Sequence, residues 1–253
     1  MSMIDSSRDG RILLITLNEP SKLNALTMEG CRELAHLWDL FEADASLGVA
    51  IITGTGRAFC AGHDLADDIT SPMPDTGWGG LSRRHTMDKP IIAAANGLTV
   101  GGGFELALAC DLIIADEKAR FGLPEPRVGF AALGGGANLL ATSMPWHVAM
   151  RYLLTGELMD AQTAQRWGIV SDVAPAGTSM DMARRYAETI LEGAPFAVRA
   201  TKAVARAAVE AAASKEDIFQ LSMSWFNRII HLEDAREGEA AFKEKRKPVW
   251  KGR

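Results

Sequence analysis

The stretch TVGGGFELALACDL, residues 99–112, places three glycines in front of an apolar helical pattern that contains one carboxylate, Glu105. The neighbours of Glu105 are apolar on every side, and a helix that is apolar all round is typical of a buried position. Charged side chains are rarely buried without a partner, because removing an ion from water costs several kcal/mol. The sequence therefore predicts a buried helix in which Glu105 has either a structural partner or a chemical role.

Strand-like runs lie on both sides of this helix. We expect strands at 11–18, 48–54, 90–97 and 110–116, with a hairpin turn at Asp9-Gly10. Thr27 can cap a helix whose apolar face is Met28, Cys31, Leu34, Leu37, Trp38 and Phe41. Helices that alternate with strands favour an α/β core.

The second half of the chain has a mainly helical pattern. Apart from a strand at 168–174, we expect helices over 145–154, 161–167, 179–191, 195–213 and 215–229. The stretch 67–84 is rich in Pro, Gly and Ser, which predicts a mobile loop of a length that is often functional.

Composition indicates an ordinary soluble protein. Its 253 residues suit one domain with one large core, and the net charge of −5 argues against nucleic-acid binding. Cys31, Cys60 and Cys110 match neither a zinc spacing nor a disulfide framework, which fits a reducing compartment. No apolar run reaches the length of a membrane span, and the first ten residues lack the core of a signal peptide. We therefore expect a cytoplasmic protein.

Two glycine-bearing turns are candidates for binding a negatively charged oxygen. They are 56–65, after the strand at 48–54, and 101–103, after the strand at 90–97. Each can present backbone N–H groups, and two such donors on one carbonyl oxygen form an oxyanion hole. The alternative is that these glycines only permit tight turns between strand and helix.

Two carboxylates lie near these turns. Glu105 follows the second turn, and Glu125 lies between two prolines in FGLPEPRVG, residues 121–129. Such a pair can hold one water, with one carboxylate as base and the other as acid. The alternatives are a salt bridge from Glu105 to a buried Arg, and a solvated loop charge for Glu125.

Seven stretches, in order along the chain, resemble the crotonase superfamily of enoyl-CoA hydratases and isomerases. They are LNEPSKLNAL (17–26), GRAFCAGHDL (56–65), KPIIAAANG (89–97), GGGFELALACDLIIAD (101–116), FGLPE (121–125), LTGE with AQTAQRWGIVSDV (154–173), and REGEAAFKEKRKPVW (236–250). The resemblance covers essentially the whole chain. It implies an α/β fold in which a spiral of β-β-α turns is followed by a C-terminal helical region.

The resemblance also implies an organisation and a set of partners. Residues 1–190 would form the spiral core with the CoA and catalytic site, and 191–253 a helical trimerisation region. The expected assembly is a homotrimer or a dimer of trimers. Its interface would include the apolar residues Trp225, Phe226, Ile229 and Ile230, which are alternatively internal core. The partner is an acyl-CoA substrate, without nucleic acid or membrane. No cofactor or metal is expected, since coenzyme A is part of the substrate.

The site residues follow from the same resemblance. His63 and Gly102 would provide the two N–H groups of the oxyanion hole, and Glu105 and Glu125 would be catalytic. The expected CoA-binding residues are Lys22, Ala25, Ala61, Gly62, Asp64 and Leu65. The basic residues Lys243, Lys245, Arg246 and Lys247 are further candidates for the CoA phosphates, or else a solvated helix face.

These residues together predict an enoyl-CoA hydratase-type lyase that adds water across the 2,3 double bond of an enoyl thioester. The alternatives are a dehydratase of a polar hydroxyacyl-CoA, a double-bond isomerase, and a non-catalytic acyl-CoA-binding protein. Two positions depart from the family pattern. His63 replaces a small residue, so its imidazole either enters the acyl site or turns outward. Leu133 stands where a glycine is common, in a loop at 130–136 that lacks the usual Pro-Gly.

Overall fold

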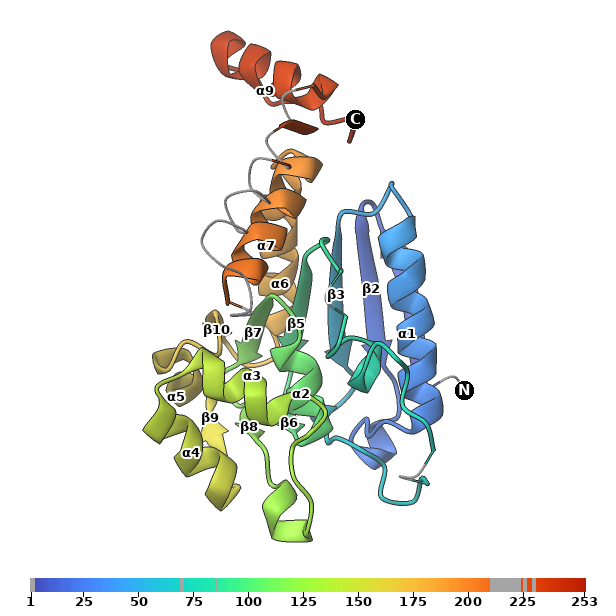
Figure 1. The fold of residues 1–253 in the computed structure, drawn as a ribbon, viewed down its shortest axis with the longest axis vertical. Coiled ribbons are helices and arrows are strands. Elements are labelled where there is room, and N and C mark those ends of the chain that lie inside the picture. The colour runs from blue at the N-terminus through green and yellow to red at the C-terminus, as the bar shows by residue number, and fades with distance from the viewer. Residues whose placement is uncertain (1–2, 69–70, 85, 210–223, 225–226, 229–230) are drawn as a thin grey trace.

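Strands form two sheets in the part of the chain that the computed structural model describes, residues 3–68, 71–84, 86–209, 224, 227–228 and 231–253 (Figure 1). The larger sheet has the order β1-β2-β3-β5-β7-β10, and its strands are β1 (Ile4–Asp9), β2 (Ile12–Leu17), β3 (Val49–Gly54), β5 (Ile91–Ala95), β7 (Leu112–Asp116) and β10 (Asp172–Ala174). The smaller sheet has the order β4-β6-β8-β9, with β4 (Ala58–Cys60), β6 (Leu98–Val100), β8 (Arg120–Gly122) and β9 (Met159–Asp160). The predicted α/β class is therefore confirmed.

The central strands of the larger sheet, β2, β3, β5 and β7, are buried on both faces, whereas the edge strand β1 is mostly exposed. Ile12, Val49 and Ile114 on one face pack with Ala183 and Ala187 of helix α6 (Ser179–Leu191). The alternate residues of the same strands join the main core together with helix α1 (Met28–Ala43): Leu13, Ile15, Leu17, Ala50, Ile52, Ile91, Ala93, Ala95, Ile113 and Ala115. Successive side chains of a strand point to opposite faces, so burial of both faces requires the continuous apolar runs seen in the sequence.

The first elements form as the sequence predicts. The hairpin between β1 and β2 turns at Gly10, whose φ is +56°. Helix α1 begins after Thr27, whose Oγ1 accepts a hydrogen bond from the Gly30 N–H at 3.1 Å. The expected apolar face of α1 is buried except for Leu37, which is half-buried.

The smaller sheet was not expected from the sequence. The short strand β4 lies within the first glycine-bearing stretch, 56–65, and β6 separates β5 from the turn at 101–103. Each of β3, β5 and β7 is thus followed by a three-residue strand of the second sheet. β4 pairs with β6 and β6 with β8 in parallel, so the carboxyl ends of all three meet at one edge.

The expectation of a mobile loop over 67–84 is wrong for its second half. Residues 78–80 form a short 3₁₀ turn, η2 (Trp78–Gly80), and Trp78 and Leu81 are buried. Gly80 lies against the backbone of Ala35 in α1, where an added Cβ would be 2.4 Å from the Ala35 Cα. Trp38 of α1 also donates its indole N–H to the Gly79 carbonyl at 2.9 Å. The glycines here serve close packing rather than flexibility.

The second half is helical, as predicted, with additions. Helices α4 (Trp146–Thr155), α5 (Ala161–Arg166), α6 and α7 (Pro195–Val209) match expected helices. Helices α2 (Gly102–Leu108), α3 (Gly136–Ser143) and α9 (Glu233–Glu244) and the 3₁₀ turns η1 (Pro20–Lys22) and η3 (Glu125–Val128) complete the described elements. Most of the helix expected at 215–229 lies outside the described residues, as do Trp225, Phe226, Ile229 and Ile230; within it, Ser224, Asn227 and Arg228 are described and helical. No helix among the described residues is long and apolar enough to cross a membrane.

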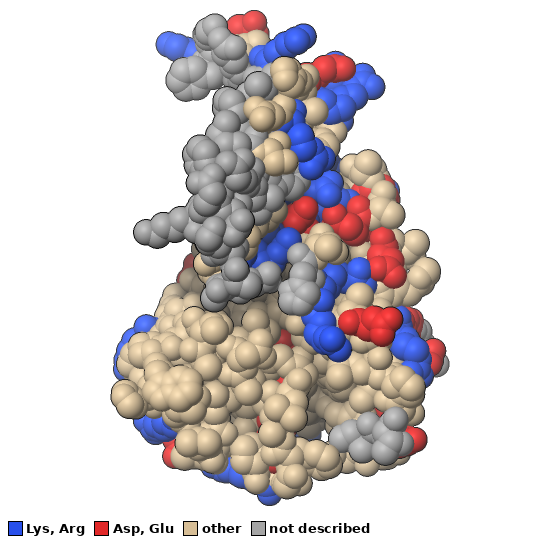
Figure 2. Space-filling model, in the orientation of Figure 1, with Lys and Arg blue, Asp and Glu red and all other residues tan. Residues whose placement is uncertain are grey.

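Helix α7 contacts the α/β part of the protein largely through ion pairs. Its basic residues form three ion pairs with acidic residues of the body: Arg199 with Glu42 at 2.9 Å, Lys202 with Asp111 at 2.7 Å, and Arg206 with Asp88 at 2.9 Å. The buried apolar residues of α7 are only alanines. On the face shown in Figure 2, charged residues of both signs run from the top down the right-hand side, whereas the lower left is mostly uncharged.

The packing of η2 on α1 gives a stability prediction. Gly80→Ala forces a left-handed residue (φ +66°) and a clash with Ala35, so we expect the free energy of unfolding to fall by about 3 kcal/mol. Gly129→Ala is the matched control, because Gly129 has φ +80° with no atom within 4 Å of an added Cβ. It should lose only about 1 kcal/mol. Urea denaturation measures both, and equal losses would contradict the role assigned to the Ala35 contact.

Candidate functional site

Three segments that carry predicted site residues start at the same edge of the smaller sheet. Residues 61–63 follow β4, residues 101–102 follow β6, and residues 123–125 follow β8. Gly62, at φ +98°, lies so close to the second turn that an added Cβ would be 2.9 Å from the Gly102 nitrogen. The two glycine turns are therefore in direct backbone contact.

The N–H groups of His63 and Gly102 are left without acceptors in this arrangement. The neighbours of His63 are fixed by a bridge to Leu26, in which the Leu26 N–H donates to the Gly62 carbonyl at 2.7 Å and the Asp64 N–H donates to the Leu26 carbonyl at 2.8 Å. Neither the His63 nor the Gly102 N–H donates to any residue that the structure describes. Both N–H groups can therefore donate a hydrogen bond to a ligand oxygen.

Each glycine of the 101–103 turn is required by its surroundings. Gly101 has φ +57°, a side chain on Gly102 would overlap the indole of Trp78, and one on Gly103 would lie 2.1 Å from the Cys60 carbonyl oxygen. The alternative that these glycines permit a tight turn is thus correct. It does not exclude a role in an oxyanion hole, because the same turn leaves the Gly102 N–H unpaired.

Glu105 is buried without a cation. Its side chain is only 5% exposed, and its Oε1 accepts a hydrogen bond from the Gly136 N–H at 2.9 Å. Burial raises the pKa of Glu105 to about 7; the N–H groups of Gly136 and Gly134 oppose this rise, and the charge of Glu125 adds to it. Among the described residues no Arg pairs with Glu105, so the salt-bridge alternative is wrong.

Glu125 is the first residue of η3 and is half-buried, not a solvated loop charge. Its Oε2 is buried without a hydrogen-bond partner, and its Oε1 would be 3.5 Å from a Cβ added to Gly101. Burial raises the pKa of Glu125 above its usual value. Glu105 and Glu125 thus interact electrostatically beside the second glycine turn, and both favour the protonated form more than exposed carboxyls do.

The His63 imidazole turns inward rather than outward. Its side chain is 15% exposed, its Nε2 lies 3.4 Å from the Asp67 carboxylate, and its ring meets the Trp78 indole edge-on with centroids 5.8 Å apart. Leu133, the other departure, is 82% exposed, while the glycines that follow it contact Glu105. The unusual residue at 63 therefore changes the wall of the site, and the one at 133 faces solvent.

Most of the expected CoA-binding residues come together beside the first glycine turn. The Ala61 N–H donates to the Leu23 carbonyl at 3.0 Å, which joins the segment of Ala25 to that of Ala61 and Gly62. Lys22 and Asp64 form an ion pair at 2.7 Å, which raises the pKa of Lys22 and lowers that of Asp64. Leu65 is 83% exposed.

The C-terminal basic cluster is not brought to this site within one chain. Helix α9 and the residues after it lie at the far end of the long axis from α2 and β6 (Figure 1). Arg246 is paired with Glu237 and Glu244, both at 2.6 Å, and Lys245 and Lys247 are exposed. The side chain of Lys243 lies outside the described part. The cluster fits the alternative of a solvated, ion-paired helix face.

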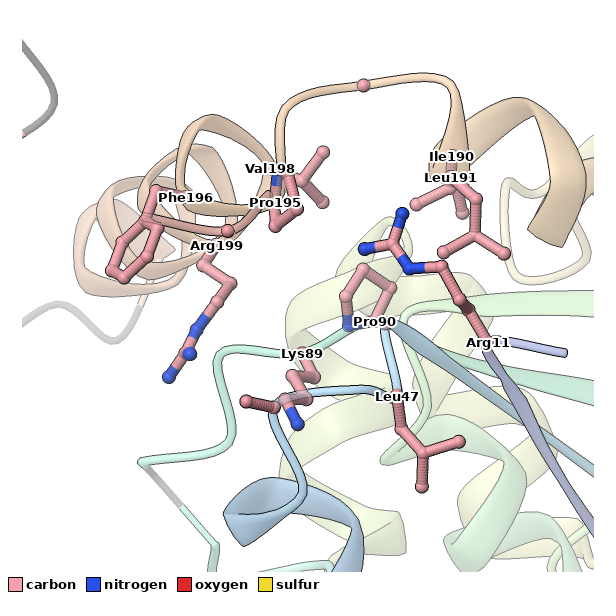
Figure 3. A pocket seen from close by; sticks show the side chains of 14 residues that line it. Arg11, Leu47, Lys89, Pro90, Ile190, Leu191, Pro195, Phe196, Val198 and Arg199 are labelled. Carbon is pink, nitrogen blue, oxygen red and sulfur yellow. The ribbon is translucent and has the colours of Figure 1, made fainter. Parts of the chain in front are cut away.

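A separate cavity of about 110 Å³ lies between the larger sheet and the α6–α7 connection. Figure 3 shows Arg11 extending toward its centre, while the charged end of Arg199 points away. Lys89, in its wall, is buried and donates to the carbonyls of Phe41 and Asp44. No carboxylate lines this cavity, so it lacks the acid–base pair found beside the glycine turns. Among the described residues, no group of His, Cys, Asp and Glu side chains is arranged to hold a metal ion.

Sequence reasoning missed the residues that hold Glu105. Gly134 and Gly136 supply the N–H groups, and Trp78 packs beside them. The available signal was the second glycine triplet, 134–136, which repeats the pattern of 101–103. In the sequence, this second triplet stands out only because its loop lacks the Pro-Gly that is usual in the family.

Comparison with known proteins agrees with this geometry, in which parallel strands deliver two glycine turns and two carboxylates to one edge. The family profile described as enoyl-CoA hydratase/isomerase matches residues 7–253. The chain belongs to this family, the crotonase superfamily, and is therefore an enzyme of an acyl-CoA-binding family.

Similar relatives are carnitinyl-CoA dehydratases. That of Proteus mirabilis is 43% identical over 254 residues, covering 96% of each chain, and that of Escherichia coli is 40% identical over 255 residues, covering 98% of this chain and 97% of the other. Crystal structures of enoyl-CoA hydratases from Mycobacterium marinum and Mycobacterium tuberculosis match with TM-scores of 0.94 and 0.93. They are 38% and 37% identical and cover 99% of each chain, which confirms the expected crotonase fold.

The burial of Glu105 predicts a pH-dependent cost in stability. Its pKa is about 7 in the folded protein against 4.5 for a free side chain, so the unfolded chain ionises first and stability falls from about pH 4.5 to pH 7. Glu105→Gln cannot ionise. Relative to wild type, we expect it to gain up to about 3 kcal/mol between pH 4.5 and pH 8. Urea denaturation at both pH values measures this, with Glu117→Gln on the surface as the control. A pH-independent difference would contradict the raised pKa.

Proposed function

We propose that this enzyme is a hydro-lyase that adds water to, or removes it from, carbons 2 and 3 of an acyl-CoA thioester. The observation that supports it best is the pair Glu105 and Glu125, one buried and one half-buried carboxyl with raised pKa values beside the unpaired N–H groups of His63 and Gly102. Hydration requires a group that takes a proton from water and another that gives one to carbon, and this pair offers both.

In the proposed hydration, the thioester oxygen accepts hydrogen bonds from the His63 and Gly102 N–H groups. This polarises the conjugated double bond, so C3 becomes electrophilic. Glu105 takes a proton from the bound water as its oxygen bonds to C3, and the electron pair moves to the thioester oxygen as an enolate. The enolate re-forms the carbonyl while C2 takes a proton from Glu125, and the proton on Glu105 returns to Glu125 through solvent. Each N–H donor stabilises the enolate-like transition state by ~3 kcal/mol.

The reverse sequence is the second candidate, dehydration of a 3-hydroxyacyl-CoA. It uses the same groups in the opposite order, with Glu125 as the base at C2. The names of the relatives at 40–43% identity favour it, because both are dehydratases. An isomerase would depend on Glu125 alone, and a binding protein would depend on neither carboxylate.

The carboxylates give the main test. Glu105→Gln and Glu125→Gln should each lower turnover by about 10²–10⁴-fold, because each removes a proton carrier. The double variant should be little slower than the slower single variant, since residues that act as a unit are not additive. Turnover is followed by the enoyl-thioester absorbance, consumed from crotonyl-CoA or formed from 3-hydroxybutyryl-CoA.

Glu117→Gln is the matched control, the same change on an exposed carboxylate between the two, and should keep the wild-type rate. A large loss only in Glu125→Gln would favour the isomerase. Near-wild-type rates in both variants would overturn the proposed mechanism, and absence of turnover in the wild type on any acyl-CoA would favour a binding protein.

Lys22 is the proposed phosphate contact of CoA. Its side chain is 52% exposed, and within the described part of the chain its ammonium pairs with Asp64 alone, so a phosphate can share it. Lys22→Glu should weaken CoA binding by about tenfold or more at low salt, because the substitution places two carboxylates side by side there. Isothermal titration with CoA measures this, and Lys118→Glu, on the surface, is the control. If both substitutions weakened CoA binding equally, the cause would be the overall charge of the protein, and Lys22 would not be a specific phosphate contact.

A further inference from the structure

We infer that Trp78 is a positioning residue that aligns the two N–H donors of the site. The inference rests on the proposed function, in which the N–H groups of His63 and Gly102 bind the thioester oxygen. Trp78 contacts neither the water nor the reacting carbons in that scheme. Its contacts are with the groups that do, and three separate contacts carry the inference.

The first contact fixes Gly102. The Trp78 indole N–H donates to the Gly102 carbonyl at 2.7 Å. The same indole lies so close to this glycine that a Cβ added to Gly102 would be 2.5 Å from ring atoms. A glycine has little intrinsic preference for one backbone conformation, so its orientation has to come from its neighbours. The ring limits where the Gly102 Cα can lie, and the hydrogen bond holds the carbonyl of the peptide that follows it, so Gly102 is restrained at its Cα and on its C-terminal side.

The second contact is with the other donor residue. The His63 ring meets the Trp78 indole at 66° with centroids 5.8 Å apart, an edge-to-face arrangement that aromatic rings favour. On its other side, the His63 Nε2 lies 3.4 Å from the Asp67 carboxylate, which also accepts the Met28 N–H at 2.7 Å. The side chain of residue 63 is thus held between Trp78 and the start of α1.

The third contact is with the support of Glu105. A Cβ added to Gly134 would be 3.0 Å from the Trp78 Cβ and 2.5 Å from the Glu105 Oε2. Gly134 is therefore enclosed between Trp78 and the carboxylate that its N–H group bonds. One side chain consequently touches both donor residues and the glycine segment that binds Glu105.

Trp78 itself is firmly seated. It is 5% exposed, its backbone N–H donates to the Ser82 Oγ at 2.9 Å, and η2 packs on α1 through Gly80. A purely structural tryptophan is available for comparison in the same region. Trp38 is fully buried and donates its indole N–H to the Gly79 carbonyl at 2.9 Å. It makes the same kind of hydrogen bond, but among the described residues it makes no hydrogen bond or ring contact with His63 or Gly102.

The experiment compares Trp78→Phe with Trp38→Phe. Both remove an indole N–H and keep an aromatic ring, but only the first removes a direct contact with a donor residue. The probe is butyryl-CoA labelled with carbon-13 at the thioester carbonyl, which binds but has no double bond to hydrate. Infrared spectroscopy measures how far the bound carbonyl band shifts to lower frequency, which reports polarisation and not stability. Crotonyl-CoA kinetics supply kcat and KM separately.

For Trp78→Phe we expect the carbonyl shift to fall by about half or more and kcat to fall by about 10–100-fold, with KM nearly unchanged. Trp38→Phe, which removes a hydrogen bond to the neighbouring Gly79, should lose comparable thermal stability but no more of the shift or of kcat than Ser82→Ala loses. Ser82→Ala, which loosens the seat of Trp78 but leaves its indole, should give a smaller change in the same direction. It also serves as the test if Trp78→Phe does not fold.

A full carbonyl shift and a wild-type kcat in Trp78→Phe would overturn the inference, as would an unchanged shift in Ser82→Ala if only that variant folds. An equal loss of shift in Trp38→Phe would overturn it too, since the effect would then be structural. Failure of the proposed function looks different: the wild type itself would bind butyryl-CoA without any shift of the band and would not hydrate crotonyl-CoA.

Discussion

The parallel pairing of β4, β6 and β8 is the constraint on which the rest of the site depends. Each strand has three residues, and the carboxyl ends of all three meet at one edge. Segments that are about 40 and 20 residues apart in sequence therefore leave the sheet side by side. Their backbones come close enough that Gly62 and Gly103 have no space for a Cβ, because it would overlap backbone atoms of the next turn. The glycines allow this approach, and hydrogen bonds within the turns then leave only particular N–H groups unpaired.

The buried carboxylate is stabilised by dipoles and not by a cation, which determines its chemistry. An Arg beside Glu105 would lower its pKa and fix it in the ionised form. The N–H groups of Gly134 and Gly136 offset only part of the cost of burial, so the pKa stays near neutrality and the group can gain or lose a proton at physiological pH. The stability lost by burying Glu105 is thus connected directly to its capacity for proton transfer.

The sequence predicts the long elements better than the short ones, for a physical reason. β2, β3, β5, β7, α1 and α6 are long enough to show periodicity, and each was expected close to its observed bounds. Strands of three residues carry no periodic signal, so the smaller sheet was missed although its turns were identified. The segment at Trp78 has a loop-like composition, because close packing on α1 needs the same glycines that a flexible loop would have. The partner of Glu105 was also unpredictable, since a backbone N–H leaves no mark on the sequence.

The two carboxyls are better considered as one titrating unit than as two independent groups. Burial raises the pKa of both, and the charge of Glu125 adds to the rise at Glu105, so the protonation state of one affects that of the other. In the proposed mechanism, the pair needs one proton and one negative charge at the start of hydration, and the same total at the start of dehydration. Only the location of the proton differs between the two directions. A site in which the two carboxyls keep the same total charge can therefore serve both reactions. The direction then follows from which thioester is supplied, not from a change in the protein.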